Sequence, residues 1–203
     1  MVDAHHIARS ELIIGGQKSG KSVRAEKLAA QWLAMSPTHT AVLIATAQAH
    51  DAEMHARIAR HQADRAARVP AMCTVEEPLN LADALTQHST PQTLLVVDCL
   101  TLWLTNQLFP YTSPQAQPTQ NNASNKLENA ENTAQSALLL IAIKSASGPV
   151  VIVSNEIGLG VIPMGRDVRA YVDALGRLNQ DVACVCQRVT LMTAGLPLIL
   201  KDT

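Results

Sequence analysis

The sequence of 203 residues contains few aromatic and few charged residues. Aromatic residues make up 2% and charged residues 16%, whereas hydrophobic residues reach 47%. We therefore expect an aliphatic core of ordinary size. The formal net charge is −1, and no basic stripe is present, so the composition argues against a nucleic-acid partner. The length suits one domain over residues 1–203.

Signals for membranes and secretion are also missing. No apolar run approaches the roughly 18 residues of a membrane span, and residues 1–11 lack the apolar centre of a secretory signal. The four cysteines are scattered, namely Cys73, Cys99, Cys184 and Cys186. The Cys-x-Cys pair has neither the spacing nor the second pair of a zinc knuckle. We interpret all four as buried, reduced thiols and expect a cytoplasmic protein.

The most informative stretch is residues 12–22. An apolar strand, Leu12 to Ile14, precedes the pattern G-x-x-x-x-G-K-S, and a helical pattern follows over 23–33. Glycines let backbone N–H groups turn inward around phosphate, and the helix N-terminus adds its dipole. Lys21 is then expected to reach the β- and γ-phosphates, and Ser22 to ligate Mg²⁺. The alternative is a glycine-rich turn before an ordinary helix. The flanking strand and helix favour the phosphate-binding loop, because that motif requires both.

Apolar runs alternate with helical patterns along the whole chain, which is typical of a parallel sheet covered on both faces. Further strands are expected at 41–46, 71–75, 93–98 and 149–154, and helices at 51–68, 79–87, 126–147 and 167–187. The C-terminus predicts two strands, 189–193 and 196–200, turned at Ala194 and Gly195. Residues 1–10 form an N-terminal extension, and the polar residues 110–125 a surface insert. The predicted fold class is α/β, a single P-loop NTPase-like (RecA-like) domain with an antiparallel C-terminal strand pair.

Asp98 ends the strongly apolar strand 93–98. A carboxylate at this place in a phosphate-loop protein can hold Mg²⁺ opposite Ser22. The alternative is that Asp98 caps the helix that follows, and the two roles are compatible.

The helix expected from Asp51 carries a second candidate. Met54, Ile58, His61 and Arg65 share one helix face, on which the first two can anchor the helix against the body. The stretch is basic, which suits a triphosphate. A histidine there could attack phosphorus as a covalent nucleophile. From the residues alone, a solvated helix histidine is the favoured interpretation.

Asn155 and Glu156 follow the strand 149–154. Ligands of open α/β sheets lie beyond the carboxyl ends of strands, so both residues are placed to meet a substrate. A tight turn with a side-chain cap explains them equally well, and the residues alone do not separate the two.

A set of motifs occurs in one collinear order. They are G-G-Q-K-S-G-K-S at 15–22, I-A-T-A-Q at 44–48, D-x-E-M-x-x-R-I at 51–58, H-Q-A-D-R at 61–65, E-E-P-L at 76–79, V-V-D-C-L-T-L-W-L-T-N at 96–106, S-N-E-I-G-L-G-V-I-P at 154–163 and G-R-L-N-Q at 176–180. The set, spanning about residues 13–201, resembles the bifunctional adenosylcobinamide kinase / adenosylcobinamide-phosphate guanylyltransferase family of cobalamin biosynthesis.

The resemblance implies two reactions on one corrinoid partner. ATP or GTP phosphorylates adenosylcobinamide, and GTP then guanylylates a histidine that passes GMP to the cobinamide phosphate. The implied catalytic residues are His61 and Lys21. The implied nucleotide-binding residues are Gly15, Gly16, Gln17, Lys18, Ser19, Gly20, Lys21, Ser22, Ala45, Thr46, Ala47, Gln62, Ala63, Asp64, Arg65, Glu76 and Asp98, with Ser22 and Asp98 for Mg²⁺. We expect Glu76 to recognise an edge of the guanine base. We expect Asn155, Glu156 and Arg169 to contact the corrinoid. Because the family tends to form homo-oligomers, the resemblance also predicts a homo-oligomer, of which a trimer is one form.

The chain departs from the family pattern in three places. Gln17 and Lys18 stand where a small residue and arginine are usual, and lysine lacks the bidentate fork of arginine. Arg60 precedes the histidine, where a second histidine or an arginine is common, and the insert 110–125 is longer than usual. Two other functions remain open from the residues: a phosphate-loop kinase of a small alcohol with an inert His61, and a RecA-like ATP-driven module for a macromolecule. The neutral charge disfavours a module that binds nucleic acid.

Overall fold

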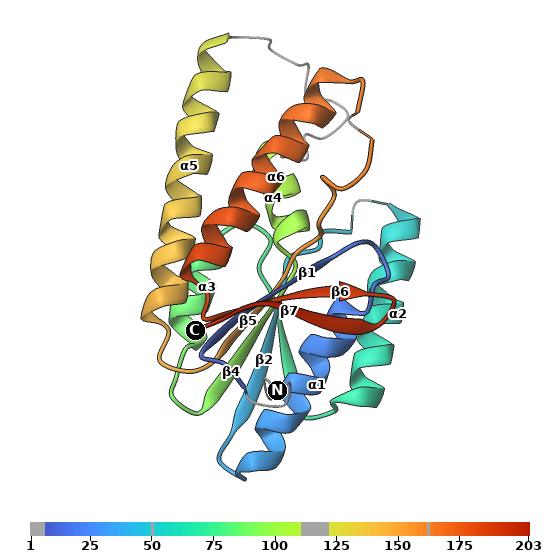
Figure 1. Ribbon diagram of the computed structural model, residues 1–203, viewed down its shortest axis with the longest axis vertical. Helices are drawn as coiled ribbons and strands as arrows, with labels where there is room; N and C mark the ends of the chain where they lie inside the picture. Colours follow the sequence, from blue (N-terminus) through green and yellow to red (C-terminus); the bar gives the residue numbers. More distant parts are fainter. Residues whose placement is uncertain (1–6, 50, 111–121, 162) are drawn as a thin grey trace.

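The computed structural model describes residues 7–49, 51–110, 122–161 and 163–203, with the backbone alone for residues 122–132. Seven strands form one sheet in the order β3-β2-β4-β5-β1-β6-β7 (Figure 1). They are β1 Ser10–Gly15, β2 Thr40–Ala45, β3 Met72–Glu76, β4 Thr93–Asp98, β5 Val150–Val153, β6 Arg188–Thr193 and β7 Leu196–Asp202. Every pair is parallel except β6 with β7. The predicted fold class, with its antiparallel C-terminal pair, is confirmed.

Helices cover both faces of the sheet. They are α1 Lys21–Met35, α2 Ala52–Arg68, α3 Leu81–His88, α4 Leu100–Leu108, α5 Asn122–Ser145 and α6 Arg166–Val185. Alternate residues of each central strand enter two separate cores. Leu12 packs with α3, α4, α5 and α6, whereas Ile13 packs with α1. Burial on both faces explains why the strands are continuous apolar runs. Within the described residues, no helix is long and apolar enough to cross a membrane.

Helix α2 is the least packed of the helices that connect strands. Asp51 caps it as predicted, since its Oδ1 accepts a hydrogen bond from the backbone N–H of Met54 at 2.7 Å. Met54 and Ile58 are only half-buried, and Arg65 is the one buried residue of the helix. The predicted anchoring face is therefore shallow. An ion pair between Arg68 and Glu26 of α1, at 2.6 Å, also holds the helix.

Two boundary predictions were wrong. Helix α1 begins at Lys21 rather than at residue 23, so the lysine and serine of the phosphate loop lie in its first turn. Of the predicted insert 110–125, residues 111–121 lie outside the described residues, and residues 122–125 belong to α5. A helix can begin in a polar stretch because intrinsic helix propensity does not depend on apolar periodicity.

The prediction that all cysteines are buried is half right. Cys99 and Cys186 are buried, but Cys73 and Cys184 are exposed, and all four are free thiols. Cys73 lies on the edge strand β3, and Cys184 in the last turn of α6, where neighbouring apolar residues did not imply burial. Burial raises the pKa of Cys99 to about 11 and that of Cys186 to about 12.

Candidate active site

The phosphate loop joins β1 to α1 in a backbone shape that requires glycine. Gly15 has a φ of +150°, and a Cβ atom there would lie 2.4 Å from the carbonyl oxygen of Met192 on β6. Gly20 has a φ of +101° and precedes the first residue of α1. The loop is thus folded tightly against the sheet and delivers the chain directly into a helix N-terminus, where backbone N–H groups are free to bind an anion.

The side chain of Lys21 binds the backbone of this loop. Its ammonium group donates hydrogen bonds to the carbonyl oxygens of Gly15 at 3.0 Å and Gly16 at 2.7 Å. Burial lowers the pKa of the Lys21 ammonium below its ordinary value, and the carboxylate of Asp98 acts in the opposite direction. The positive charge that a triphosphate needs is therefore held at the loop by two carbonyl oxygens, which phosphate oxygens would replace as acceptors.

Ser22 and Asp98 meet as predicted. The Ser22 hydroxyl donates a hydrogen bond to Asp98 Oδ2 at 2.9 Å. The N-cap of α4 is Cys99 and not Asp98, so the carboxylate is not used as a helix cap. A hydroxyl and a carboxylate oxygen are hard ligands that fit Mg²⁺. The described part of the chain gathers no group of three or more His, Cys, Asp or Glu side chains, at this edge or elsewhere.

The carboxyl ends of the strands bring the other predicted residues to the same edge. Ala45 pairs in register with Glu76 on one side and with Asp98 on the other. Asp98 pairs with Val153, and Val153 with Ile13, two residues before the loop. Ala45, Thr46, Ala47 and Glu76 therefore lie along the row that begins at the phosphate loop. Glu76 is exposed there, so its carboxylate is accessible to a ligand.

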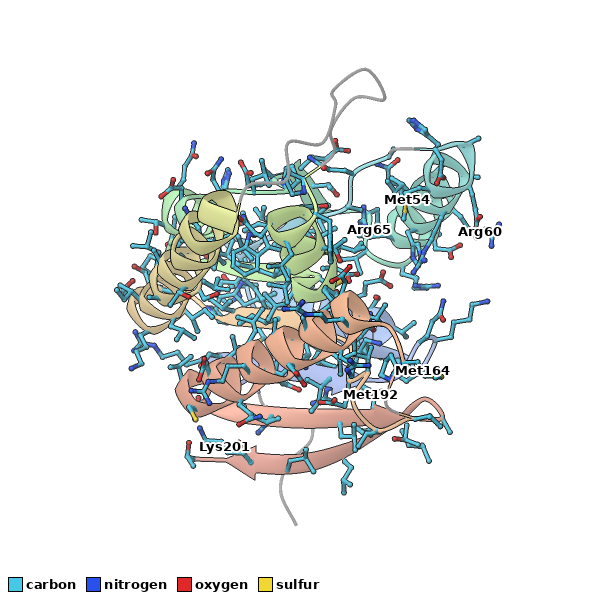
Figure 2. The ribbon with its side chains drawn as sticks, turned by 90° about the horizontal axis from the view of Figure 1, so that it is seen from above. Met54, Arg60, Arg65, Met164, Met192 and Lys201 are labelled. Carbon is cyan, nitrogen blue, oxygen red and sulfur yellow. The ribbon has the colours of Figure 1, made fainter. Side chains whose placement is uncertain are left out.

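The histidine segment lies on α2, apart from this row. His61, Gln62, Ala63 and Asp64 are exposed, while Arg65 is 9% exposed. Figure 2 shows Arg65 on the side of α2 that faces the body and Arg60 on the outer side. Among the described residues, His61 and the Arg65 guanidinium form no hydrogen bond or ion pair with a side chain. Within the part of the chain that the structure describes, no hydrogen bond or ion pair therefore links His61 to the loop.

The residues predicted to meet the corrinoid have other partners in the structure. Glu156 Oε1 accepts a hydrogen bond from the N–H of Gly158 at 3.1 Å, which is the turn-capping role considered as the alternative. Arg169 donates from Nη1 to the carbonyl oxygens of Pro163 and Met164. The backbone N–H of Glu156 binds the carbonyl oxygen of Gly15 at 3.1 Å, so this loop begins against the phosphate loop.

Sequence reasoning missed the side chains that fix the loops of this edge. Asn106 and Thr101 of α4 and Asn179 of α6 bind the backbone of loops after strands. All three lie inside the family motifs. The only signal in the sequence that could have marked them is a polar residue among the apolar positions of a helix.

Comparisons with known proteins agree with this architecture. Residues 11–200 match the family described as cobinamide kinase / cobinamide phosphate guanyltransferase. The bifunctional adenosylcobalamin biosynthesis protein CobP of Pseudomonas aeruginosa is 45% identical over 94% of this chain and 96% of its own length. The protein CobU of Escherichia coli is 32% identical over 94% of this chain and 98% of its own. A solved Pyrococcus horikoshii structure shares the fold, with a TM-score of 0.54, 10% identity, and 97% of this chain and 88% of that chain covered. The chain therefore belongs to the cobinamide kinase / cobinamide phosphate guanyltransferase family.

Proposed function

We propose that the protein phosphorylates adenosylcobinamide and then converts the product to adenosylcobinamide-GDP. The observation that carries this proposal is the family match over residues 11–200, which contains the folded phosphate loop. In the first reaction the aminopropanol hydroxyl oxygen attacks the γ-phosphorus of ATP or GTP, and the nucleoside diphosphate leaves. In the second, a histidine nitrogen attacks the α-phosphorus of GTP and pyrophosphate leaves. The cobinamide phosphate oxygen then displaces the histidine and takes GMP.

The phosphate loop serves both reactions. The N–H groups of residues 15–22 and the Lys21 ammonium hold the triphosphate. Ser22 and Asp98 hold Mg²⁺, which supplies charge neutralisation to the phosphates when it is bound. Gln17 and Lys18 are exposed on the outer part of the loop, where Lys18 contributes a point charge and not a fork.

His61 is the proposed nucleophile for the second reaction. A phosphate loop alone transfers the γ-phosphoryl group and needs no histidine, whereas attack at the α-phosphorus needs a separate group. Among the described residues, no hydrogen bond or ion pair holds the nitrogen atoms of the exposed His61 imidazole. Arg65, which faces the body, balances charge at the phosphorus. Residues 62–64 contact the nucleotide beside it. Glu76 reads guanine by accepting from its N1–H and amino group.

The corrinoid lies over the segment 154–169 in this proposal. The segment begins against the phosphate loop and exposes apolar side chains, among them Leu159, Val161 and Met164. A large ring with apolar faces suits such a surface. Asn155, Glu156 and Arg169 supply polar contacts after exchange of their present partners.

We also propose a cytoplasmic, single-domain protein that assembles as a homo-oligomer, with a trimer as one form. The edge strand β7 supports association, because Leu196, Leu198 and Leu200 are exposed along it. Multi-angle light scattering of the purified protein tests the assembly; a monomer at micromolar concentration contradicts it.

The decisive experiment uses GTP labelled at the α-phosphate. The protein should acquire an acid-labile, base-stable label, and the His61→Ala variant should lose the label but keep phosphorylation of adenosylcobinamide. His55→Ala is the matched control, since His55 is also exposed on α2 and should label normally. An unlabelled but kinase-active wild-type protein excludes the guanylyl transfer. Normal labelling of His61→Ala excludes His61 as the nucleophile.

A further inference from the structure

Helix α4 carries a buried side chain that binds two loops of the active-site edge at once. The Asn106 amide nitrogen Nδ2 donates hydrogen bonds to the carbonyl oxygen of Thr46 at 2.8 Å and to that of Pro78 at 3.1 Å. Asn106 is 8% exposed. Thr46 follows β2, and Pro78 stands two residues after Glu76. One amide therefore joins the loop next to Asp98 to the loop that follows Glu76, the proposed base-reading residue at the end of β3.

The loop after β3 is held from α4 at another point as well. Trp103 Nε1 and Gln107 Nε2 each donate to the carbonyl oxygen of Leu79 at 2.8 Å. On its other side, the N–H of Glu77 binds the carbonyl oxygen of Ala45 at 2.9 Å. The backbone on the carboxyl side of Glu76 is thus fixed to both β2 and α4, and Asn106 is the only one of these helix side chains that spans the two loops.

The first turn of α4 binds a different loop. The Thr101 hydroxyl accepts a hydrogen bond from the N–H of Asn155 at 2.9 Å. Tyr171 of α6 donates to the carbonyl oxygen of Thr101 at 2.9 Å. Thr101 therefore supports the segment proposed for the corrinoid, whereas Asn106 supports the segment proposed for the base. The two side chains lie on one short helix and each satisfies a backbone group of a loop.

We propose that Asn106 is a positioning residue that sets the preference of the second reaction for guanine. The inference rests on the proposed function, in which Glu76 reads the base. Discrimination by a carboxylate requires its oxygen atoms to be held near the N1–H and amino group, and a displacement of about 1 Å can cost roughly a hundredfold. Without the Asn106 amide, the carbonyl groups of Thr46 and Pro78 lose their shared donor. The loop after Glu76 then keeps its bonds to Trp103, Gln107 and β2 but loses its direct link to the loop after β2 through Asn106.

The test compares labelling of the protein by GTP and by ITP, both carrying label at the α-phosphate. Inosine lacks the 2-amino group of guanosine, so the GTP-to-ITP ratio of initial labelling rates reports base reading. We expect Asn106→Ala and the isosteric Asn106→Asp to lower this ratio by roughly tenfold to a hundredfold. Thr101→Val, which removes a half-buried hydrogen bond of the same helix, should leave the ratio unchanged and raise the KM for adenosylcobinamide phosphate. A ratio is independent of the amount of folded protein, so partial unfolding does not imitate the effect.

Glu76→Gln separates the possible failures. If it lowers the ratio and the Asn106 variants do not, Asn106 has no positioning role although the base-reading assignment stands. If Glu76→Gln leaves the ratio intact, the base reading by Glu76 is wrong and the inference is wrong with it. If Thr101→Val lowers the ratio as much as Asn106→Ala, the effect is a general loosening of α4 and the specific role is refuted. Absence of label on the wild-type protein rejects the proposed function itself.

Discussion

A buried ion pair under the phosphate loop gives the clearest test of stability. Arg24, in α1, donates from Nε to Glu11 Oε1 of β1 at 2.8 Å. Its Nη2 lies 2.8 Å from the same oxygen, at an angle that makes an ion pair without a second hydrogen bond. Thr190 of β6 donates to this oxygen at 2.7 Å. Glu11 is 1% exposed and Arg24 is 9% exposed. We predict that Arg24→Leu is strongly destabilising.

The expected loss of stability depends on which charged group of the pair remains buried. Removing the guanidinium leaves an unpaired carboxylate in the core, and its Oε2 already has no hydrogen-bond partner within the described ranges. Breaking a buried pair in this way costs about 3–5 kcal/mol, whereas replacing both partners by apolar residues is often nearly neutral. The double variant Glu11→Leu/Arg24→Leu should therefore recover most of the loss. Thr190 then keeps an unpaired hydroxyl, which accounts for a residual cost of about 1 kcal/mol.

Urea unfolding followed by tryptophan fluorescence and circular dichroism measures both effects. Trp103 is buried and Trp32 is half-buried, so each reports loss of packing. If the unfolding free energy falls by about 2 kcal/mol per molar urea, the single variant should lower the urea midpoint by about 1.5–2.5 M. A change of under about 0.5 M for Arg24→Leu, or a double variant less stable than the single one, refutes the reasoning that a stranded charge dominates the cost.

Three further predictions concern the loop and the thiols. Gly15→Ala should destabilise the protein by at least about 1–3 kcal/mol and abolish GTP binding, because its Cβ would overlap the Met192 carbonyl oxygen; wild-type calorimetric GTP binding by this variant contradicts the steric argument. Asp98→Asn should raise the Mg²⁺ concentration for half-maximal kinase activity about tenfold or more, since a charged ligand is lost; an unchanged Mg²⁺ dependence removes Asp98 from the metal site. Iodoacetamide at pH 8 should alkylate Cys73 and Cys184 in the folded protein but not Cys99 and Cys186, whose pKa values near 11 and 12 keep them protonated; mass spectrometry of the digest decides, and rapid modification of Cys99 refutes its burial.

The fold could be predicted because its signals are local and redundant. Continuous apolar runs such as residues 93–98 mark central parallel strands, and Gly20 with Lys21 and Ser22 marks the turn into a helix. The contact between Ser22 and Asp98 was also predictable, since the carboxyl ends of parallel strands meet at one edge. Each of these inferences needs only a few neighbouring residues and the geometry of a parallel sheet.

Other features depend on partners that are distant in sequence. Asn106 binds Thr46 and Pro78, which lie 60 and 28 residues away. No pattern around Asn106 names these carbonyl groups, because backbone acceptors have no sequence signature. The exposure of Cys73 has a similar origin: it depends on β3 being an edge strand, and strand order is not written in the local composition.

The same contrast explains why the His61 side chain has no hydrogen-bond partner among the described residues while Asn106 has two. A positioning side chain must find its partners in the protein, and its burial records them. A nucleophile for the α-phosphorus must instead keep its nitrogen atoms free until the triphosphate is bound, and exposure on the thinly packed α2 fits this role. The ordered motifs single out His61 among seven histidines, whereas the geometry ties Asn106 to the loop that follows Glu76, the residue proposed to read the base. The labelling experiment with His61→Ala tests the first assignment and the GTP-to-ITP ratio tests the second, so either can fail without the other.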